Sequence, residues 1–326
     1  MKALVYKGVE HLEFCDVPDA DPRQGEHLIR VEAVGICGSD MHAYLGHDAR
    51  RPAPLILGHE AAGVIVGSDQ DGRRVTVNPL VTCGRCGACK SGRDNLCPDR
   101  QIISMRPREG AFAQLIAMPD TNLVSVPDHI PFEKAALAEP LAVSWHTVRL
   151  ALETLHGDLS PNALVIGGGA IGLAAALAFG AMGVQTVTIV EPNTARRAFL
   201  RDTCKQNAVA FAAGQFNVVI DAVGYAATRE AASALAEPGG VIAHVGLGED
   251  LGGLDVRRMT LQEISFIGTY TYTAQDFRDT AQALFDGRLG ALEWIDIRPL
   301  AQGAEAFKQL RAGTVSAPKI VLTPWV

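Results

Sequence analysis

Apolar and polar residues alternate at strand spacing through the first third of the chain. The alternation is clearest at 28–34 and 74–77, and Gly, Pro and Asp residues separate such stretches from one another. A period of two is the pattern of a strand with one buried face, and the separating residues are typical of tight turns. Residues 1–125 therefore predict a β-rich, barrel-like lobe.

From about residue 133 the pattern changes to short apolar runs that alternate with helical periods. Residues 132–152 have the period of a helix. Strands that are apolar on both faces and alternate with helices form a doubly wound parallel sheet. The expected strands are 163–166, 187–190, 217–222, 241–245 and 264–267, and the expected helices are 171–182 and stretches near 195–206 and 226–236.

The two patterns indicate an α/β protein with two domains. A length of 326 residues is enough for about two domains. We expect the first domain at 1–143 and a dinucleotide-binding domain at 144–272. The remainder, 273–326, has a mixed pattern, and its last strand, 319–323, is expected to return to the first domain and complete it.

Charge and composition exclude two classes of partner. The net charge is −7 and Lys and Arg are scattered along the chain, so nucleic acid is not an expected partner. No run approaches the roughly 20 apolar residues that span a bilayer, so no membrane contact is expected. The strand pattern starts at residue 1 without a signal peptide, and an odd total of seven cysteines suits a reducing compartment. We therefore expect a cytoplasmic protein.

Four cysteines lie within fifteen residues: Cys83, Cys86, Cys89 and Cys97. The spacing C-x2-C-x2-C-x7-C lets a short loop place four thiolates around one ion, which is the closed tetrahedral form of a structural zinc site. An iron–sulfur cluster also uses four cysteines, and Pro98 after the last one is a partial match to ferredoxins. The spacing favours zinc.

A glycine-rich loop lies between the first expected parallel strand and the helix that follows it. Gly167, Gly169 and Gly172 satisfy G-x-G-x-x-G, and Ala170 and Ile171 start the helix. In this fingerprint the first glycine permits a tight turn, the second lets a pyrophosphate approach the backbone, and the third lets the helix pack closely on the sheet. These five residues are the expected phosphate-binding loop of a dinucleotide site.

The second expected strand ends at Glu191, about 20 residues beyond the loop, as the fingerprint requires. A carboxylate there hydrogen-bonds the adenosine ribose and repels a 2′-phosphate, which favours NAD over NADP. Arg196 and Arg197 soften that preference, because an arginine nearby can accommodate the extra phosphate. Glu191 and Arg196 are therefore expected cofactor contacts.

A second group of metal-binding residue types lies upstream, at Cys37 and His59. A thiolate and an imidazole, completed by a carboxylate, leave a fourth position open, which is the catalytic form of a zinc site. Ser39, two residues after the thiolate, is placed to take up a proton from the substrate, and His42 to pass it towards solvent. A lone Cys or His is usually a core residue, so the pairing carries this prediction.

Together these motifs resemble the zinc-dependent medium-chain dehydrogenases/reductases, over essentially the whole chain. Within that family the sequence is most similar to the sorbitol, polyol and threonine dehydrogenase branch. The resemblance implies a GroES-like catalytic domain, a Rossmann cofactor domain, two zinc ions per chain, NAD, and a homodimer or homotetramer. The motifs are GICGSDMH at 35–42, GHEAAG at 58–63, the cysteine group at 83–97, AEPLAV at 138–143 and GGGAIG at 167–172.

The resemblance also assigns further site residues. In the polyol branch the third ligand of the catalytic zinc belongs to a glutamate in the EPL segment, here Glu139, and Glu60 follows His59 directly. Which of the two carboxylates binds zinc stays open at this stage. The branch places substrate contacts near Tyr44 and after the last strand of the cofactor domain, where this chain has Thr269 and Tyr270 in place of an Arg-Tyr pair.

The expected reaction is hydride transfer between a secondary alcohol, such as a polyol, sugar alcohol or sugar acid, and the nicotinamide. Simple alcohols, aldehydes and threonine-type substrates are the alternative within the same chemistry. Two other classes compete: a zinc-free quinone reductase, which would lack the cysteine group, and a zinc protein that senses NAD without chemistry. The complete set of metal, proton-transfer and cofactor residues favours the enzyme.

Overall fold

The computed structural model describes residues 1–157 and 160–325, which form two compact units. Unit 1 contains Met1–Glu139, Thr273–Phe285 and the segment from Ile295 onward, and unit 2 contains Pro140–Tyr272 and Asp286–Trp294. The first boundary thus lies four residues before the expected one, and the chain returns to unit 1 at Thr273.

The expected return segment is interrupted by residues 286–294, which cluster with unit 2. The Arg288 guanidinium explains this placement, because it donates to the Ala181 carbonyl at 2.7 Å and lies over the Trp145 ring, 5.7 Å from its centroid. Leu292 and Trp294 are buried as well. Apolar burial and one cation–π contact therefore hold this short segment in unit 2.

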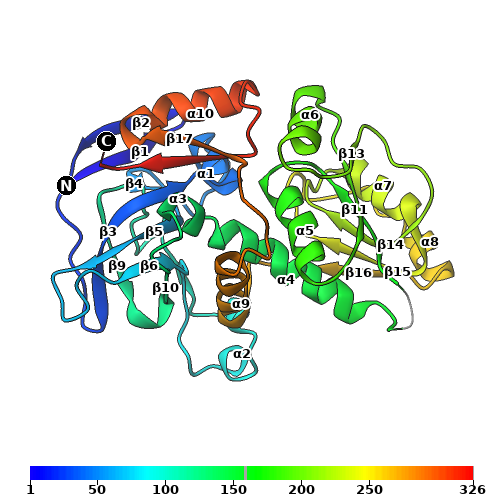
Figure 1. Ribbon diagram of the computed structural model, residues 1–326, viewed down its shortest axis with the longest axis horizontal. Helices are drawn as coiled ribbons and strands as arrows, with labels where there is room; N and C mark the ends of the chain where they lie inside the picture. Colours follow the sequence, from blue (N-terminus) through cyan, green and yellow to red (C-terminus); the bar gives the residue numbers. More distant parts are fainter. Residues whose placement is uncertain (158–159, 326) are drawn as a thin grey trace. The chain divides into compact units, whose positions relative to one another are not determined.

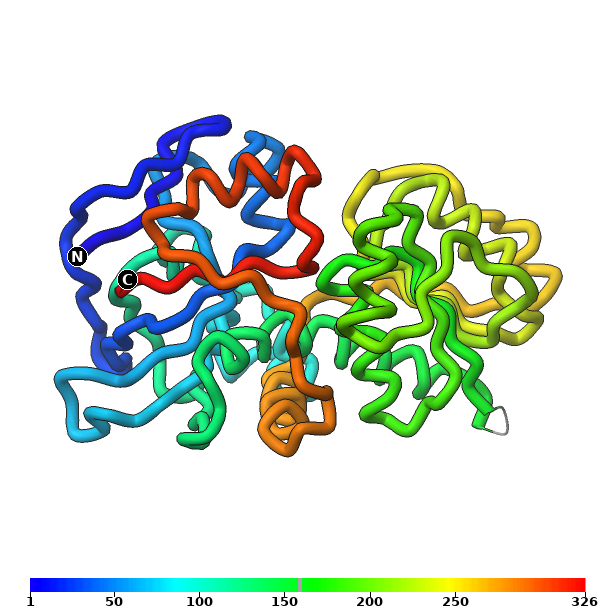
Figure 2. Tube along the Cα trace, turned by 45° about the horizontal axis from the view of Figure 1, so that its top comes forward, coloured from blue at the N-terminus to red at the C-terminus, as the bar shows by residue number. Residues whose placement is uncertain are grey.

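The main sheet of unit 1 has seven strands, in the order β10-β6-β5-β3-β18-β17, with β9 paired to β3. The C-terminal strand β18 pairs antiparallel with β3 and parallel with β17, so the strand expected at 319–323 does return to the first domain. Figure 2 shows this C-terminal segment, in red, among the blue and cyan N-terminal strands. The bounds are β3 Glu26–Gly35, β5 Glu60–Val66, β6 Arg74–Val77, β9 Leu115–Pro119, β10 Leu123–Ser125, β17 Ile295–Pro299 and β18 Lys319–Thr323.

Two smaller sheets complete the β-structure of unit 1, with strand orders β2-β1-β4 and β7-β8. Apolar side chains from these sheets and the main sheet form one buried core, in which Leu4, Ile29 and Phe112 are fully buried. The bounds are β1 Lys2–Gly8, β2 His11–Asp16, β4 Leu55–Ile56, β7 Leu80–Val81 and β8 Gln101–Ile102; the helices are α1 Gly38–Tyr44, α2 Gly87–Lys90, α3 Phe132–Ala135, α9 Ala274–Phe285 and α10 Gly303–Ala312, with short 3-10 turns η1 Asp94–Leu96, η2 Asp120–Asn122 and η3 Leu300–Gln302.

Unit 2 contains a six-stranded, all-parallel sheet in the order β13-β12-β11-β14-β15-β16, which confirms the predicted doubly wound fold. The five expected strands and three expected helices are all present, with ends shifted by a few residues. The bounds are β11 Asn162–Ile166, β12 Thr186–Val190, β13 Ala208–Val209, β14 Phe216–Asp221, β15 Ala236–His244 and β16 Ser265–Gly268; the helices are α4 Ala138–Thr154, α5 Ala170–Ala181, α6 Thr194–Asp202, α7 Ala226–Leu235 and α8 Val256–Leu261.

Helices cover both faces of this sheet: α5 lies on one side, and α7 and α8 on the other (Figure 1). The central strands β11, β14 and β15 contain apolar runs because both faces of the sheet are covered; Leu164, Val219 and Ile242 are fully buried. Within the described parts of the chain, no helix combines the length and hydropathy that crossing a membrane requires.

Candidate functional site

The four clustered cysteines converge in a small lobe around α2. Their sulfurs all lie within 4.8 Å of one another, with Cys86 Sγ at 3.5 Å and Cys83 Sγ at 4.0 Å from Cys89 Sγ. Sulfurs around a tetrahedral zinc with bonds of about 2.3 Å are about 3.8 Å apart. The spacing of the donors therefore fits a zinc ion, as predicted for Cys83, Cys86, Cys89 and Cys97.

Backbone N–H groups favour the thiolate form of one cysteine in this lobe. Hydrogen bonds from the backbone of Arg85 and Cys86 lower the pKa of the Cys83 thiol to about 7. Burial and the neighbouring sulfurs of Cys86 and Cys97 raise the pKa of Cys89 to about 12. Zinc displaces the thiol protons, so one ligand is largely prepared for metal while another must lose its proton on binding.

The second group of metal-binding residues forms where β3 ends and β5 begins. The donor atoms of Cys37, His59 and Glu60 lie within 4.8 Å of one another. Strand pairing creates this proximity, because Gly35 lies opposite Glu60 in the antiparallel register. A Cβ at Gly35 would come within 2.0 Å of Glu60 Oε2, so only glycine leaves room for this carboxylate.

Glu60 is fully buried, and its two oxygens differ. Oε1 accepts from Lys319 Nζ at 2.6 Å, whereas Oε2 has no hydrogen-bond partner among the described residues. Burial lowers the pKa of Lys319, but the charge of Glu60 outweighs burial and raises it, so the pair is ionic. A buried carboxylate oxygen without a partner is costly. Its position beside a thiolate and an imidazole fits a third zinc ligand.

The ring of His59 is held on both sides. Nε2 is 3.4 Å from Ser39 Oγ, and Nδ1 is 3.3 Å from both Asp40 Oδ1 and Ser104 Oγ. Burial lowers the pKa of His59, but the charges of Asp40 and Cys37 outweigh burial and raise the pKa well above its ordinary value. Because Nδ1 already faces Asp40 and Ser104, Nε2 is the nitrogen left for a metal ion.

Asp40 connects the two metal-binding segments. Its buried carboxylate accepts from the backbone N–H of Cys37 at 3.0 Å and of Gly58 at 3.1 Å, in addition to its contact with His59. Burial raises the pKa of Asp40, but His59, Arg51 and these hydrogen bonds outweigh burial and lower it. An ionised Asp40 therefore fixes the backbone beside both metal-binding side chains.

The residues expected to move protons lie on helix α1. Ser39 is half-buried and His42, three residues later on the same helix face, is exposed. Tyr44 on the same helix is only 2% exposed, and its ring packs against Phe307 with centroids 5.2 Å apart. The expectation that Tyr44 contacts substrate is therefore not supported, because its ring belongs to the core of unit 1.

Glu139, the carboxylate that the resemblance assigned to zinc, is also buried. Among the described residues, the group of donor atoms within 4.8 Å contains Glu60 and not Glu139. The charge of Glu139 nevertheless contributes to raising the pKa of Lys319. Glu139 is thus close enough to influence the pair that holds Glu60.

The glycine loop of unit 2 has the geometry of a phosphate site. Gly167 has φ +99°, and a Cβ there would clash with Val223; a Cβ at Gly172 would lie 1.7 Å from the Gly167 carbonyl. A Cβ at Gly169 would meet no atom within 4 Å, so its outer side is open. Gly169 precedes α5, whose first residues, Ala170 and Ile171, carry the N–H groups that bind phosphates in this kind of loop.

Glu191 follows β12, and its side chain contacts the backbone of this loop. Its carboxylate accepts from the backbone N–H of Gly168 at 3.0 Å and of Asn193 at 2.7 Å. Arg196 Nη1 lies 3.6 Å from the same carboxylate, and its Nε has no hydrogen-bond partner in the part of the chain that the structure describes. Arg197 instead donates to the backbone carbonyls of Glu191 and Pro192. Arg196 is therefore the arginine whose side chain remains near the predicted adenosine position.

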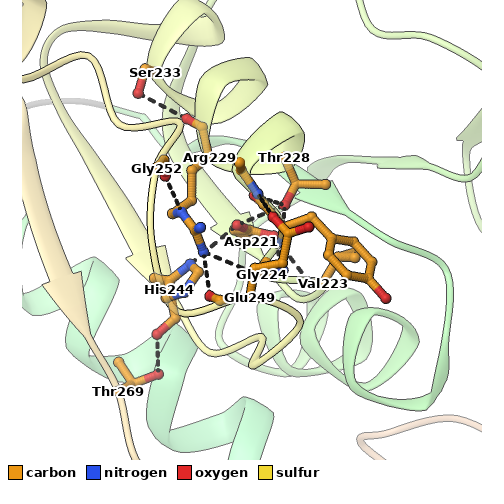
Figure 3. Close-up of polar contacts among 12 residues, drawn as sticks. Asp221, Val223, Gly224, Thr228, Arg229, Ser233, His244, Glu249, Gly252 and Thr269 are labelled. Carbon is orange, nitrogen blue, oxygen red and sulfur yellow. Dashed lines mark hydrogen bonds and ion pairs between the residues drawn. The ribbon is translucent and has the colours of Figure 1, made fainter.

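A polar network lies at the carboxyl ends of β14 and β15 (Figure 3). The Asp221 carboxylate accepts from the N–H of Val223 and Gly224 and from the Thr228 hydroxyl, and lies 3.1 Å from His244 Nδ1. Burial raises the pKa of Asp221, but these hydrogen bonds outweigh burial and lower it. The network fixes the loop that carries Val223, which packs on Gly167.

Arg229 and Thr269 extend this network on either side, as Figure 3 shows. The buried Arg229 guanidinium donates to the carbonyls of Gly224, Glu249, Leu251 and Gly252 and so holds the loop after β15.

Thr269, expected near substrate, is hydrogen-bonded within unit 2. Its hydroxyl lies 2.9 Å from the Thr147 hydroxyl and 3.4 Å from the His244 carbonyl. Tyr270, the other residue expected there, is half-buried.

Four residues near the proposed metal site were not predicted from the sequence: Asp40, Arg51, Ser104 and Lys319. Lys319 is 259 residues from Glu60 in sequence, and no local pattern links the two. Ser104 has φ +69°, a backbone conformation that the presence of a serine in the sequence does not indicate. Asp40 had a local signal, because it is the third residue after Cys37 and its side chain caps the backbone N–H of that residue.

Comparisons with known proteins agree with this geometry. Residues 23–128 match the alcohol dehydrogenase GroES-like domain, and residues 170–286 match the family described as zinc-binding dehydrogenase. A sorbitol dehydrogenase of Bacillus subtilis (strain 168) is 44% identical over 206 residues, which are 59% of this chain and 56% of that protein. An L-galactonate-5-dehydrogenase of Escherichia coli (strain K12) is 32% identical over 88% of both chains.

Among solved structures, acetophenone reductase from Geotrichum candidum in complex with NAD is 26% identical, with a TM-score of 0.87 over 99% of this chain and 97% of that one. The matched domains cover the cysteine lobe, most of the proposed metal site and the start of α5. This chain belongs to the zinc-dependent medium-chain dehydrogenase/reductase family of alcohol and polyol dehydrogenases.

Proposed function

We propose that the chain is a zinc- and NAD-dependent dehydrogenase that transfers hydride between the secondary-alcohol carbon of a polyol, sugar alcohol or sugar acid and the nicotinamide. The observation that carries this proposal is the partnerless oxygen of Glu60 beside Cys37 and His59. Three protein donors leave a fourth position for a small ligand, as in catalytic zinc sites. The names of the relatives support the polyol and sugar-acid classes.

Within this proposal Cys37, His59 and Glu60 hold the catalytic zinc, and Glu139 acts beside them through Lys319. Zinc in such a site supplies Lewis acidity, which lowers the pKa of an alcohol. Ser39 relays the alcohol proton: its hydroxyl, on the Nε2 side of His59, accepts that proton while it gives up its own in the direction of His42. The exposed His42 then passes the proton to solvent.

The cysteine lobe holds the second, structural zinc through all four thiolates. Its closed donor set leaves no position for substrate, so it takes no part in the chemistry.

For the cofactor we propose NAD rather than NADP. The Gly167–Gly172 loop binds the pyrophosphate, and the carboxylate of Glu191 disfavours a 2′-phosphate in its neighbourhood. Arg196 reduces this discrimination, because its guanidinium is near the same position. A modest preference for NAD, measured as the ratio of kcat/KM values, is therefore expected.

We further propose a cytoplasmic homodimer or homotetramer. A reducing compartment keeps the two thiolate-containing sites metal-bound. Strand β16 is an edge strand of the unit 2 sheet, and exposed apolar side chains lie on it and on the preceding segment. An exposed edge with apolar neighbours is suited to pairing with a second copy. These side chains are Leu247, Leu251, Val256, Leu261 and Phe266.

The decisive test combines metal analysis with a substrate panel. Purified protein is expected to contain two zinc ions per chain and to reduce NAD with one or more polyols or sugar acids. Simple primary alcohols and L-threonine serve as comparison substrates, and NADP as comparison cofactor. Protein purified without zinc, or NAD binding without turnover of any alcohol on the panel, would contradict the proposal. Light scattering of the same sample measures the oligomeric state.

A further inference from the structure

The buried guanidinium of Arg51 joins two segments that lie on opposite sides of His59. Arg51 is 3% exposed; its Nη1 donates to the Ser39 carbonyl at 2.7 Å and its Nε to the Ser104 carbonyl at 3.1 Å. Nη1 also lies 3.3 Å from Asp48 Oδ2, which compensates the charge. The planar fork of an arginine can hold two acceptors in a fixed relation, which a flexible ammonium group cannot do.

Ser104 is held in an uncommon conformation at the far end of this fork. It is completely buried and has φ +69°, in the left-handed region that non-glycine residues rarely adopt. Such residues persist where the surroundings determine them, and they cluster at functional sites. Here the conformation places Ser104 Oγ 3.3 Å from His59 Nδ1 while its carbonyl binds Arg51.

A metal-binding imidazole usually donates its other ring N–H to an oxygen acceptor, which fixes the tautomer and the orientation of the ring. For His59, Nδ1 faces the buried side chains of Asp40 and Ser104, so Nδ1–H is the supporting contact and Nε2 is the nitrogen left for a metal ion. Asp40 Oδ1 and Ser104 Oγ lie at the same distance from Nδ1, 3.3 Å. Ser104 thus shares with Asp40 the position that orients the ring.

We propose that Ser104 and Arg51 are positioning residues for the zinc ligand His59. Ser104 accepts part of the Nδ1–H hydrogen bond, and Arg51 fixes Ser104 on one side of the ring and Ser39 on the other. The inference rests on the proposed function, since it takes His59 as a ligand of the catalytic zinc. It adds to that function a link between the metal ligand and the serine that accepts the substrate proton.

The main test is the substitution Ser104→Gly in the zinc-loaded protein, with zinc release to a chelator as the readout. Glycine removes the hydroxyl, keeps the carbonyl that Arg51 binds, and adopts φ +69° without strain. Loss of a hydrogen-bond partner of a metal-binding histidine typically weakens metal binding about 10–100-fold. We expect release of the catalytic zinc to be about 10-fold faster, with a thermal midpoint no lower than that of the wild type.

The matched control is Ser144→Ala in unit 2. Ser144 is also completely buried, and its hydroxyl donates to the Ile171 carbonyl at 2.8 Å, a contact made within unit 2. Its zinc release is expected to match the wild type. Wild-type zinc release in Ser104→Gly would overturn the role of Ser104.

Arg51→Lys tests the second part of the inference. Lysine keeps the positive charge but cannot hold both carbonyls in the geometry of the guanidinium fork. We expect faster release of the catalytic zinc and a lower kcat, since both His59 and Ser39 lose their support. Zinc release and kcat equal to those of the wild type would show that the guanidinium fork does not position these residues. If the lysine variant fails to fold, Ser104→Gly still tests the support of the His59 ring.

His59→Ala separates this inference from the proposed function. The phase of zinc release that disappears in His59→Ala is the catalytic one, and it is the phase to compare in the other variants. A His59→Ala protein that still binds two zinc ions would refute the proposed site itself. Loss of one zinc in His59→Ala together with unchanged release in Ser104→Gly and Arg51→Lys would refute only the positioning role.

Discussion

The two groups of metal-binding residues in unit 1 are built in opposite ways. The cysteine lobe takes all its donors from Cys83–Cys97, and three of its four cysteines are partly exposed. The second group takes Cys37 from just after β3 and His59 and Glu60 from the start of β5, and the His59 and Glu60 side chains each contact a further buried residue, Asp40 and Lys319 respectively. A short loop can thus enclose an ion by itself, whereas an open coordination position requires a site that the whole sheet supports.

The difference extends to how each group is connected to the rest of unit 1. The lobe contacts α9 through Asp94, whose carboxylate accepts from the Ala274 N–H at 3.0 Å. The second group is tied to β18 through Lys319 and to the chain after α1 through Arg51. A substitution in the lobe should therefore change the structure only locally, whereas a substitution in the second group should lower the catalytic activity.

The largest effect that would sharpen this comparison is expected from His59→Ala. Loss of a zinc ligand removes several kcal/mol of transition-state stabilisation, so kcat should fall at least about 1,000-fold. Zinc content should fall from two ions to one while NAD binding, measured by fluorescence titration, persists. Activity within tenfold of the wild type would show that the second group is not catalytic.

Cys86→Ser is the counterpart in the lobe. It should also remove one zinc ion, but the remaining one is catalytic, so kcat of the soluble fraction should stay within about tenfold. A loss of about 2–3 kcal/mol of stability would lower the thermal midpoint by about 5–10 °C. The comparison breaks down if calorimetry finds an unchanged midpoint or if turnover disappears in well-folded protein.

Lys319→Met tests whether zinc and lysine share the charge of Glu60. Removing one partner of a buried ion pair costs about 3–5 kcal/mol, because the other charge is left uncompensated. Bound zinc would compensate the same carboxylate, so the loss should be larger in chelator-treated protein than in zinc-loaded protein. Denaturant unfolding with and without zinc measures both values; equal losses would place Glu60 outside the metal site.

The smallest effect concerns the pH dependence of zinc binding by the lobe. Cys83, with a pKa of about 7, holds a proton below that pH, and Cys89, with a pKa of about 12, holds one throughout the neutral range. Because zinc must displace these protons, its affinity rises with pH, about tenfold per unit for each proton released. The slope should become steeper below pH 7, as Cys83 protonates; chelator competition with His59→Ala, which retains only the lobe zinc, measures it.

The parts of the molecule that sequence could predict are those whose geometry is local. The spacing of Cys83 to Cys97 and the glycines at 167–172 determine their own turns, and the apolar runs of unit 2 predicted its strands to within a few residues, with β15 starting earlier. The parts that it could not predict depend on contacts between distant segments. The grouping of Glu60, rather than Glu139, with Cys37 and His59, the ion pair with Lys319 and the buried ring of Tyr44 are of this kind.

The same reasoning explains the error in the return segment. Residues 286–294 lack the periodicity that would assign them to either unit, and their place is decided by Arg288, Trp145 and buried apolar side chains. Local pattern detects strands and helices, but it does not determine against which unit a short connecting segment packs.

Strand β18 has a consequence for the order in which the protein is made. In the main sheet of unit 1, Val321 and Leu322 pair with β3, and Lys319 forms an ion pair with Glu60. These residues leave the ribosome only after all of unit 2 has been made. During synthesis all strands of the unit 2 sheet are available first, while β3 lacks its partner strand β18 until residue 319 and those after it have been made. A nascent chain stalled before residue 319 would thus contain both sets of zinc ligands but lack the lysine beside one of them.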